Sequence, residues 1–405
     1  MSALARYATV LRPPGASAAL TASVVGRLSL GMTGLAVLLL VKDTTGSYAV
    51  AGAVSAAYAL AFAVAAPARA RSADRVGPRR VLVQCGLVHP LGLIALVALC
   101  AADAPLVALL LAAVAAGATV PPHGAVMRAL WGTLVHGPAI ATAYALEAVV
   151  VELCFVLGPL LVAIGIALEG PSTALLVSAA LSSIGALWLA GLTVVRTVEP
   201  HADRSSSSYG PLVSPVVRAL LLTVFWIGLG FGSVEVAVTA FVEEEGRSTG
   251  VTGVVLAVWS LGSMAGGLVY GALHPTTRPA RQLPVLVGAL AVASMLPVLT
   301  GTVLLLSAAL FVYGTTIAPF SACNSVLLGA AAPSGTVTEA FAWNGSMIFA
   351  GAAVGSAVGG VLADHSGSTA AFALTAVGGL AAVGSSVLGL RALSGARSGT
   401  RGDEQ

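Results

Sequence analysis

The chain has 405 residues, of which 58% are hydrophobic and only 9% are charged, and its mean hydropathy is +0.98. A water-soluble domain of this length needs a far richer charged surface, whereas helices that face lipid need none. Composition therefore excludes a soluble protein and indicates a polytopic membrane protein. The net charge of +3 comes from scattered basic residues without interleaved aromatic side chains, so we expect no nucleic-acid binding.

Glycine, proline and charged clusters divide the chain into twelve apolar stretches, each long enough for a helix that crosses a bilayer, which takes about 20 residues. The first six predicted spans are 16–41, 47–68, 81–101, 105–126, 139–168 and 171–195. The second six are 216–241, 249–272, 283–300, 302–322, 337–362 and 368–392. The predicted fold class is an all-α membrane protein with twelve transmembrane helices.

Segments of the first half of the chain recur in the second half, in the same order. The matching pairs are 117–125 (GATVPPHGA) with 314–322 (GTTIAPFSA), 50–60 with 251–261, 143–147 with 340–344, and Gly158 with Gly355. Such a period indicates duplicated units. We predict two pseudo-symmetric six-helix bundles at 1–200 and 215–395, a linker at 201–214 and a tail at 396–405. Repeated bundles with a substrate site between them are typical of alternating-access transporters.

The basic residues predict the orientation, because positively charged loops stay in the cytoplasm. If the amino terminus is inside, nearly all of the 19 Lys and Arg residues fall on inner segments. Lys42 and Arg247 lie outside, and Arg27 lies within a helix. We expect a monomeric, multi-pass protein of the cell (cytoplasmic) membrane with both termini in the cytoplasm.

No metal, cofactor or nucleotide site is expected. The four cysteines have no paired spacing, and His89 and His123 lack a second ligand three or four residues away. The chain contains no G-x-x-x-x-G-K-[ST] run for ATP, and no cluster of acid, base or metal ligands at a membrane face that would indicate an enzyme.

A short inner segment after the second predicted helix, residues 68–82, reads ARARSADRVGPRRVL. It resembles the signature loop of the major facilitator superfamily, G-x-L-A-D-R-x-G-R-R-x-x-L, at Ala73, Asp74, Arg75, Gly77, Arg79 and Leu82. It departs from that pattern at Ala70, Ser72 and Pro78. The resemblance implies the fold of that superfamily and secondary transport of a small molecule without a cofactor.

In that superfamily the loop latches the two halves together on the cytoplasmic side, with its aspartate facing the amino-terminal end of the eleventh helix. The resemblance implies that Asp74 meets the start of that helix, and that Arg75, Gly77, Arg79 and Glu339 belong to the same latch. A carboxylate is stabilised at a helix amino terminus by about 0.3–1 kcal/mol. The alternative is a basic loop that only sets the topology. In the second half Pro275 aligns with Asp74, so we expect only one latch.

Ionisable residues inside the hydrocarbon cost at least about 2.5–3.5 kcal/mol each, so each of them is a candidate for function. Arg27 lies about 16 Å from the inner end of the first predicted helix, and Glu152 lies at a similar depth in the fifth, so the two are expected to pair. Glu147, five residues before Glu152, points about 140° away. Glu235, in the seventh helix, is the main intramembrane acid of the second half. These four residues are the candidates for proton coupling or for the substrate cavity; for Arg27 and Glu152, a purely structural pair is the alternative.

Three proline sites predict helix breaks or hinges. Pro121 and Pro122 fall in the fourth predicted helix and Pro319 in the tenth, where proline frees backbone carbonyls and bends the helix. Gly158 and Pro159 in the fifth helix resemble part of the glycine-proline motif of superfamily antiporters, which favours export.

These observations together predict a proton-coupled secondary transporter that exports small lipophilic organic molecules by alternating access, through a cleft lined by the first, fourth, seventh and tenth helices. With only 5% aromatic residues, an apolar cavity suits lipophilic cargo better than sugars. An importer or uniporter of a small metabolite on the same fold is the nearest alternative. A non-transporting receptor or an integral membrane enzyme is the alternative from another class.

Overall fold

The computed structural model describes residues 3–198, 210–247, 249–273 and 278–402, and within these ranges every regular element is helical. The first part comprises α1 (Ala3–Leu11), α2 (Ala16–Thr45), α3 (Tyr48–Val76), α4 (Pro78–Ala101), α5 (Leu106–Ala118), α6 (His123–Leu134), α7 (Ala139–Glu169), α8 (Pro171–Gly191) and α9 (Thr193–Arg196). The second comprises η1 (Gly210–Val213), α10 (Pro215–Glu244), α11 (Thr249–Leu273), α12 (Pro279–Ala293), η2 (Leu296–Leu299), α13 (Val303–Ala331), α14 (Val337–Ser366) and α15 (Ser368–Gly402). Twelve segments of the described chain are long and apolar enough to cross a membrane, which confirms the predicted number.

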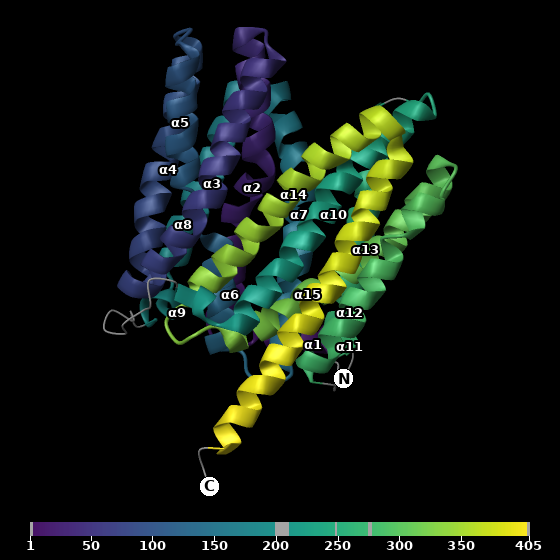
Figure 1. Cartoon of the computed structure of the whole chain (residues 1–405). Helices are drawn as coiled ribbons and strands as arrows, with labels where there is room; N and C mark the ends of the chain where they lie inside the picture. Colours follow the sequence, from purple (N-terminus) through teal and green to yellow (C-terminus); the bar gives the residue numbers. More distant parts are fainter. Residues whose placement is uncertain (1–2, 199–209, 248, 274–277, 403–405) are drawn as a thin grey trace.

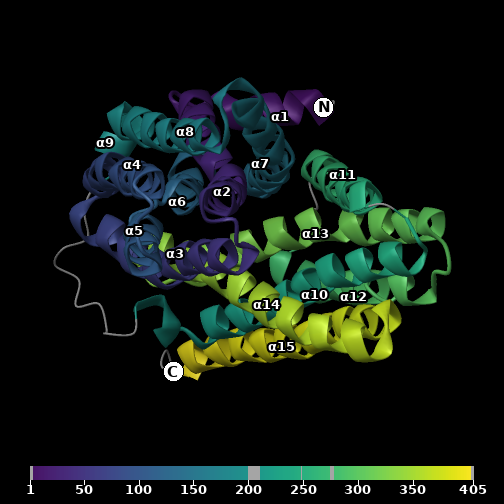
Figure 2. The ribbon, with the colours of Figure 1, turned by 90° about the horizontal axis from the view of Figure 1, so that it is seen from above.

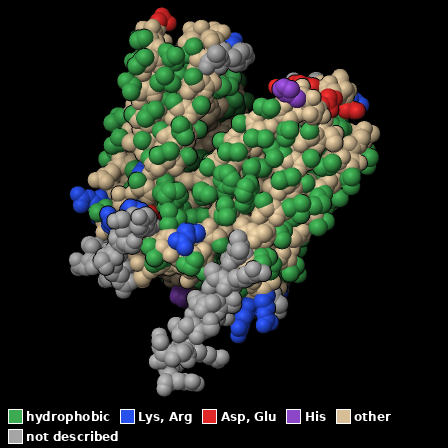
Figure 3. Space-filling view, viewed as in Figure 1, with side chains coloured by type: hydrophobic (Ala, Val, Ile, Leu, Met, Phe, Trp, Pro, Cys, Tyr) green, Lys and Arg blue, Asp and Glu red, His purple; other side chains and the backbone are tan. Residues whose placement is uncertain are grey.

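The helices form two groups that meet at one end of the molecule. Helices α2–α8 make up one group and α10–α15 the other, and both marked chain ends lie at the lower end of the view in Figure 1, which we call the terminal end. The groups meet where α3 packs on α14 and where α7 packs on α11 and α13 (Figure 2). At the opposite end, which we call the far end, Figure 3 shows the two groups separated by a hollow.

Glycine allows the first membrane span of each half, α2 or α10, to approach a neighbouring helix closely. A methyl group at Gly158 of α7 would collide with the backbone of Gly31 in α2, and one at Gly355 of α14 would collide with the carbonyl of Leu229 in α10. Lipid tails are as apolar as leucine and provide no hydrophobic drive for association, so helices in membranes pack through such small-residue contacts. Gly158 and Gly355 are matched in the sequence repeat and make equivalent contacts in the two halves.

The fourth span is broken at its two prolines, as predicted. α5 ends at Ala118 and α6 begins at His123, because Pro121 and Pro122 have no N–H to donate to the carbonyls of Gly117 and Ala118. Arg69 of α3 donates to both of these freed carbonyls, over 3.4 Å to Gly117 O and by a shorter contact to Ala118 O. A buried guanidinium therefore replaces the two helical hydrogen bonds that the prolines remove.

The other two expected breaks are absent. α13 continues through Pro319, and α7 continues through Gly158 and Pro159. A single proline removes one hydrogen bond and bends a helix, which neighbouring helices tolerate in a membrane, whereas two consecutive prolines remove two adjacent bonds. The helices are therefore unbroken at Pro319 and at Gly158-Pro159, and a hinge at either site stays a prediction.

The close contact between α10 and α14 gives a first test. Gly232 of α10 lies so near Ala352 O of α14 that a methyl group has no room, whereas a methyl at Gly253 on the exposed face of α11 meets nothing within 4 Å. We expect Gly232→Ala to lower the stability of the protein by about 1–3 kcal/mol, the usual cost of overpacking. Thermal unfolding in detergent measures it, with Gly253→Ala as the control that unfolds at or above the parent temperature. Equal unfolding temperatures for the two variants would contradict this packing.

Candidate functional site

Asp74 caps the amino terminus of a helix in the other half. Its two carboxylate oxygens accept hydrogen bonds from the backbone N–H groups of Thr338 (3.2 Å) and Glu339 (2.9 Å), in the first turn of α14. These are the second and third positions of the helix, the groups that an N-cap side chain ordinarily satisfies. Thr336, the local N-cap residue, makes no such bond, and its hydroxyl donates instead to Pro333 O. The contact predicted between Asp74 and the eleventh span is present.

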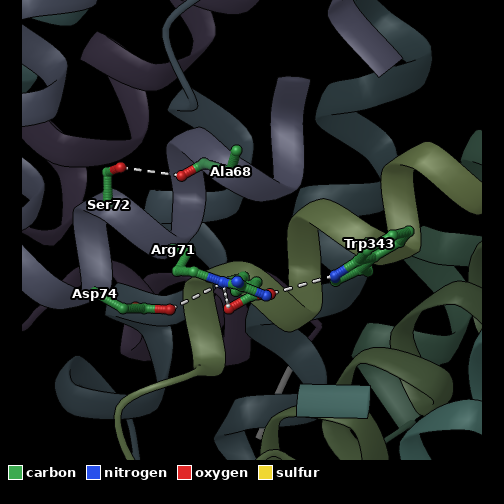
Figure 4. Close-up of polar contacts among 6 residues, drawn as sticks. Ala68, Arg71, Ser72, Asp74 and Trp343 are labelled. Carbon is green, nitrogen blue, oxygen red and sulfur yellow. Dashed lines mark hydrogen bonds and ion pairs between the residues drawn. The ribbon is translucent and has the colours of Figure 1, made fainter. Parts of the chain in front are cut away.

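Glu339 of α14 receives a second cross-half contact, from Arg71 (Figure 4). The guanidinium donates to both carboxylate oxygens, from Nε over 2.9 Å and from Nη2 over 2.6 Å, a fork geometry that is stronger than a single bond. The Trp343 indole donates to the same carboxylate over 3.4 Å. The Glu339 side chain is 2% exposed and that of Arg71 is 32% exposed, so the pair lies at the rim of the interface between the halves.

Arg71 was not among the residues singled out in the sequence, because the segment was interpreted as a loop. It is helical: α3 runs to Val76, α4 starts at Pro78, and Gly77 alone makes the turn, with φ of 92°. Residues three apart on a helix lie on one face, so Arg71 and Asp74 both point at α14. The i, i+3 spacing of Arg71 and Asp74 indicates this shared face if the segment is interpreted as a helix.

The remaining members of the expected latch are placed differently. Arg75 and Arg79 are exposed on either side of the Gly77 turn. Gly77 needs its positive φ, which other residues rarely adopt. Pro275, aligned with Asp74 in the repeat, lies outside the described residues.

A second polar site lies inside the first half. Arg27 Nη1 of α2 lies 2.5 Å from Glu147 Oε2 of α7, and Trp131 of α6 donates its indole N–H to Glu147 Oε1 over 3.1 Å. The Arg27 side chain is 6% exposed, Glu147 is 1% exposed and Trp131 is fully buried. The predicted pairing of Arg27 with Glu152 is wrong, because the rotation of α7 turns Glu147 toward Arg27 instead.

A second arginine lies near this pair. Gly124, one turn before Arg128 on α6, lies against the Arg27 guanidinium, and Gly26 leaves room for the His123 ring. The Arg128 Nε is buried without a hydrogen-bond partner, whereas Tyr144 donates to the Arg128 carbonyl over 3.2 Å. The polar interior of the first half thus holds one paired arginine with a second one nearby.

The other two candidate acids lie apart from this pair. Glu152 is half-buried on α7, and its carboxyl group faces the hydroxyls of Ser260 and Ser263 on α11, across the contact between the halves. Glu235 is exposed on α10, one turn after Phe231, whose ring packs edge-on against Trp259. The structure therefore does not bring the four candidate residues into one cluster. Among the described residues, no group of three His, Cys, Asp or Glu side chains is placed to hold a metal ion.

The halves also touch through a pair of residues that are matched in the sequence repeat. Tyr144 of α7 and Phe341 of α14 occupy matching positions 197 residues apart in the repeat, and their ring centroids lie 5.7 Å apart. A residue that contacts its own symmetry mate lies on the symmetry axis.

A further contact between the halves joins α14 and α3. Ser346 of α14 donates to Ala63 O of α3 over 2.7 Å.

The buried pair gives a second test. Removing one partner leaves an uncompensated buried charge, which costs about 3–5 kcal/mol, whereas removing both leaves neutral groups. We expect Arg27→Gln to lower the thermal unfolding temperature sharply and the double variant Arg27→Gln/Glu147→Gln to recover most of the loss. Glu152→Gln combined with Arg27→Gln is the control and should recover nothing. Additive losses in the first double variant would contradict the pairing.

Comparison with known proteins gives the family. The sequence profile described as Major Facilitator Superfamily matches residues 19–334. No curated protein sequence matches the chain.

The fold is similar to solved structures of transporters at low identity. The human organic anion transporter MFSD10 (TETRAN) matches with a TM-score of 0.74 and 17% identity over 93% of this chain and 100% of that one. A bacterial homologue of the iron transporter ferroportin in an outward-facing state matches with a TM-score of 0.75 and 14% identity over 94% and 99%. The E. coli Fucose:proton symporter matches with a TM-score of 0.69 and 13% identity over 96% and 99%. The chain belongs to the Major Facilitator Superfamily and is a membrane transporter of the secondary type rather than an enzyme.

Proposed function

We propose that the chain exports small lipophilic organic molecules across the cytoplasmic membrane in exchange for protons, by alternating access between the two halves. The observation that carries this proposal is the one-sided contact between the halves. Asp74, Arg71 and Tyr144 reach the other half toward the terminal end, whereas Figure 3 shows a hollow between the halves at the far end. A substrate site between the halves is reached from one side at a time in such an arrangement.

The charge distribution supports an orientation with both termini in the cytoplasm. In Figure 3 most basic side chains gather at the terminal end and most acidic ones at the far end, as expected when positive segments stay inside. The far-end hollow then faces outward. Similarity to the ferroportin homologue, which is described as outward-facing, supports the same assignment.

Two acids support proton coupling. Glu152 lies at the α7–α11 contact and Glu235 on α10 within the seventh span, and neither has an arginine or lysine partner in an ion pair among the described residues. A carboxylate in an apolar environment without a fixed cation is able to change its protonation as its environment changes. Arg27 and Glu147 are already paired, so we assign them to holding the first half together. A Fucose:proton symporter among the similar structures couples to protons by its description.

We propose that Asp74, Arg71 and Glu339 form the latch that stabilises closure of the terminal end. The first-turn N–H groups of α14 have no cap within their own half, so opening this end exposes them together with the Glu339 carboxylate. These contacts stabilise the closed state, and water replaces them as hydrogen-bond partners when the terminal end opens.

Transport with and without a pH gradient tests the coupling. The test uses proteoliposomes whose interior is more acidic than the bath. We expect a lipophilic fluorescent dye to accumulate in the vesicle interior through the transporter molecules that are inserted inside-out. We expect Glu235→Gln and Glu152→Gln to lose accumulation against a gradient, because neither amide binds a proton, while downhill dye exchange persists. Glu243→Gln, exposed at the end of the same helix α10, is the control and should transport normally.

Two outcomes would contradict the antiport proposal. Dye uptake that only equilibrates across the membrane, equally with and without the pH gradient, would indicate a uniporter. Accumulation driven by the opposite gradient would indicate an importer coupled by symport.

Hydrogen exchange tests the latch at the atoms involved. Loss of a cap costs about 1 kcal/mol, so Asp74→Ala should speed exchange in a peptide covering the first turn of α14 by about five-fold. Asp364→Ala, at the exposed far end of the same helix, is the control. Mass spectrometry of exchanged peptides measures both. Unchanged exchange in Asp74→Ala would show that the carboxylate does not hold this helix start.

A further inference from the structure

The first helix, α1, lies outside the two six-helix repeats and touches both halves. It lies at the terminal end, beside α7 of its own half and α11 of the other (Figures 1 and 2). Val10 is fully buried in the main hydrophobic cluster, and Leu11 packs against that cluster. The end of α1 is therefore anchored by apolar packing, while its middle faces α11.

Tyr7 makes the polar contact from α1 to the second half. Its hydroxyl donates to Leu268 O over 3.0 Å and lies 3.3 Å from Gly267 O, both on α11. A methyl group at Gly271, one turn farther along α11, would collide with the Tyr7 hydroxyl. The absence of a side chain at Gly271 thus leaves the space that the tyrosine occupies.

A second donor from the first half holds the same stretch of α11. Thr142 of α7 donates its hydroxyl to Gly271 O over 2.9 Å. The residue four positions after Gly271 is Pro275, which has no N–H, so Gly271 O lacks the usual helical donor. The first half therefore supplies hydrogen-bond partners to two helices of the second half, to α14 through Asp74 and to α11 through Thr142.

We propose that α1 is a clamp that joins the halves along the α7–α11 contact and must leave α11 before the terminal end opens. The inference rests on the proposed alternating access. The clamp lies at the α7–α11 contact and the Asp74 latch at the α3–α14 contact, so together they hold the terminal end along two separate contacts between the halves. In the described part of the second half, only the short η1 precedes the first span, α10, so the clamp described here is formed by the first half.

The chemistry of the contact suits a reversible clamp. The carbonyls of Gly267 and Leu268 lie inside α11, where the helix itself supplies a donor four residues on, so releasing Tyr7 leaves no unpaired backbone group. Burial raises the pKa of the Tyr7 phenol above its usual 10, so the hydroxyl keeps its proton and remains a donor at physiological pH. Water satisfies the hydroxyl when it is released.

Distances between spin labels test the clamp in the full-length protein. Labels at Arg80→Cys on α4 and Arg281→Cys on α12, both exposed at the terminal end, report opening of that end after the four native cysteines are replaced by alanine. We expect Tyr7→Phe to raise the open population about two- to ten-fold, the range for one lost hydrogen bond. Tyr270→Phe is the matched control, because it removes a hydroxyl on α11 that bonds Gln282 within the second half.

The outcomes separate the clamp from the function on which it rests. A larger open population in Tyr7→Phe and an unchanged one in Tyr270→Phe support the clamp. An unchanged population in Tyr7→Phe, with a shift in Asp74→Asn, would overturn the clamp and leave alternating access standing. An unchanged population in both Tyr7→Phe and Asp74→Asn would overturn the proposed alternating access as well.

Discussion

A helix in one half of this transporter begins on a carboxylate that belongs to the other half. The first-turn N–H groups of α14 need an acceptor, and Asp74 of α3 supplies it because Thr336 does not. An unpaired buried N–H costs free energy, so the contact between the halves also completes the start of this helix. The Arg71–Glu339 fork then adds charge complementarity at the same contact.

α3 connects that contact to the interior of its own half. Arg71 and Asp74 reach across to α14, while Arg69 turns inward and replaces the hydrogen bonds lost at Pro121 and Pro122. One continuous helix therefore carries both the contact between the halves and the support of the broken fourth span. In the second half the matching tenth span is unbroken, since α13 is continuous through Pro319.

The duplication preserved backbone packing and changed the polar chemistry. Gly158 and Gly355 make equivalent contacts, and Tyr144 touches its own repeat mate Phe341. In place of Glu147, however, the second half has Asn344, which accepts from Asn324 over 2.9 Å. An ion pair on one side and a neutral amide pair on the other give two halves of similar shape and different electrostatics.

The sequence by itself determined the number of spans, because hydropathy is a local property, and its repeats predicted two related halves. The contact of Asp74 with the eleventh span was implied by the resemblance of residues 68–82 to a family signature. The sequence did not determine the partner of Arg27, since depth along a helix is readable from sequence whereas rotation about its axis is not, and a rotation of about 140° separates Glu147 from Glu152. Arg71, Trp131 and Arg69 were missed for a related reason, because their partners lie on other helices: the Glu339 carboxylate, the Glu147 carboxylate and the freed carbonyls of the fourth span. Those contacts arise only when packing sets the rotation and height of each helix. Tertiary structure therefore decided which buried polar groups meet.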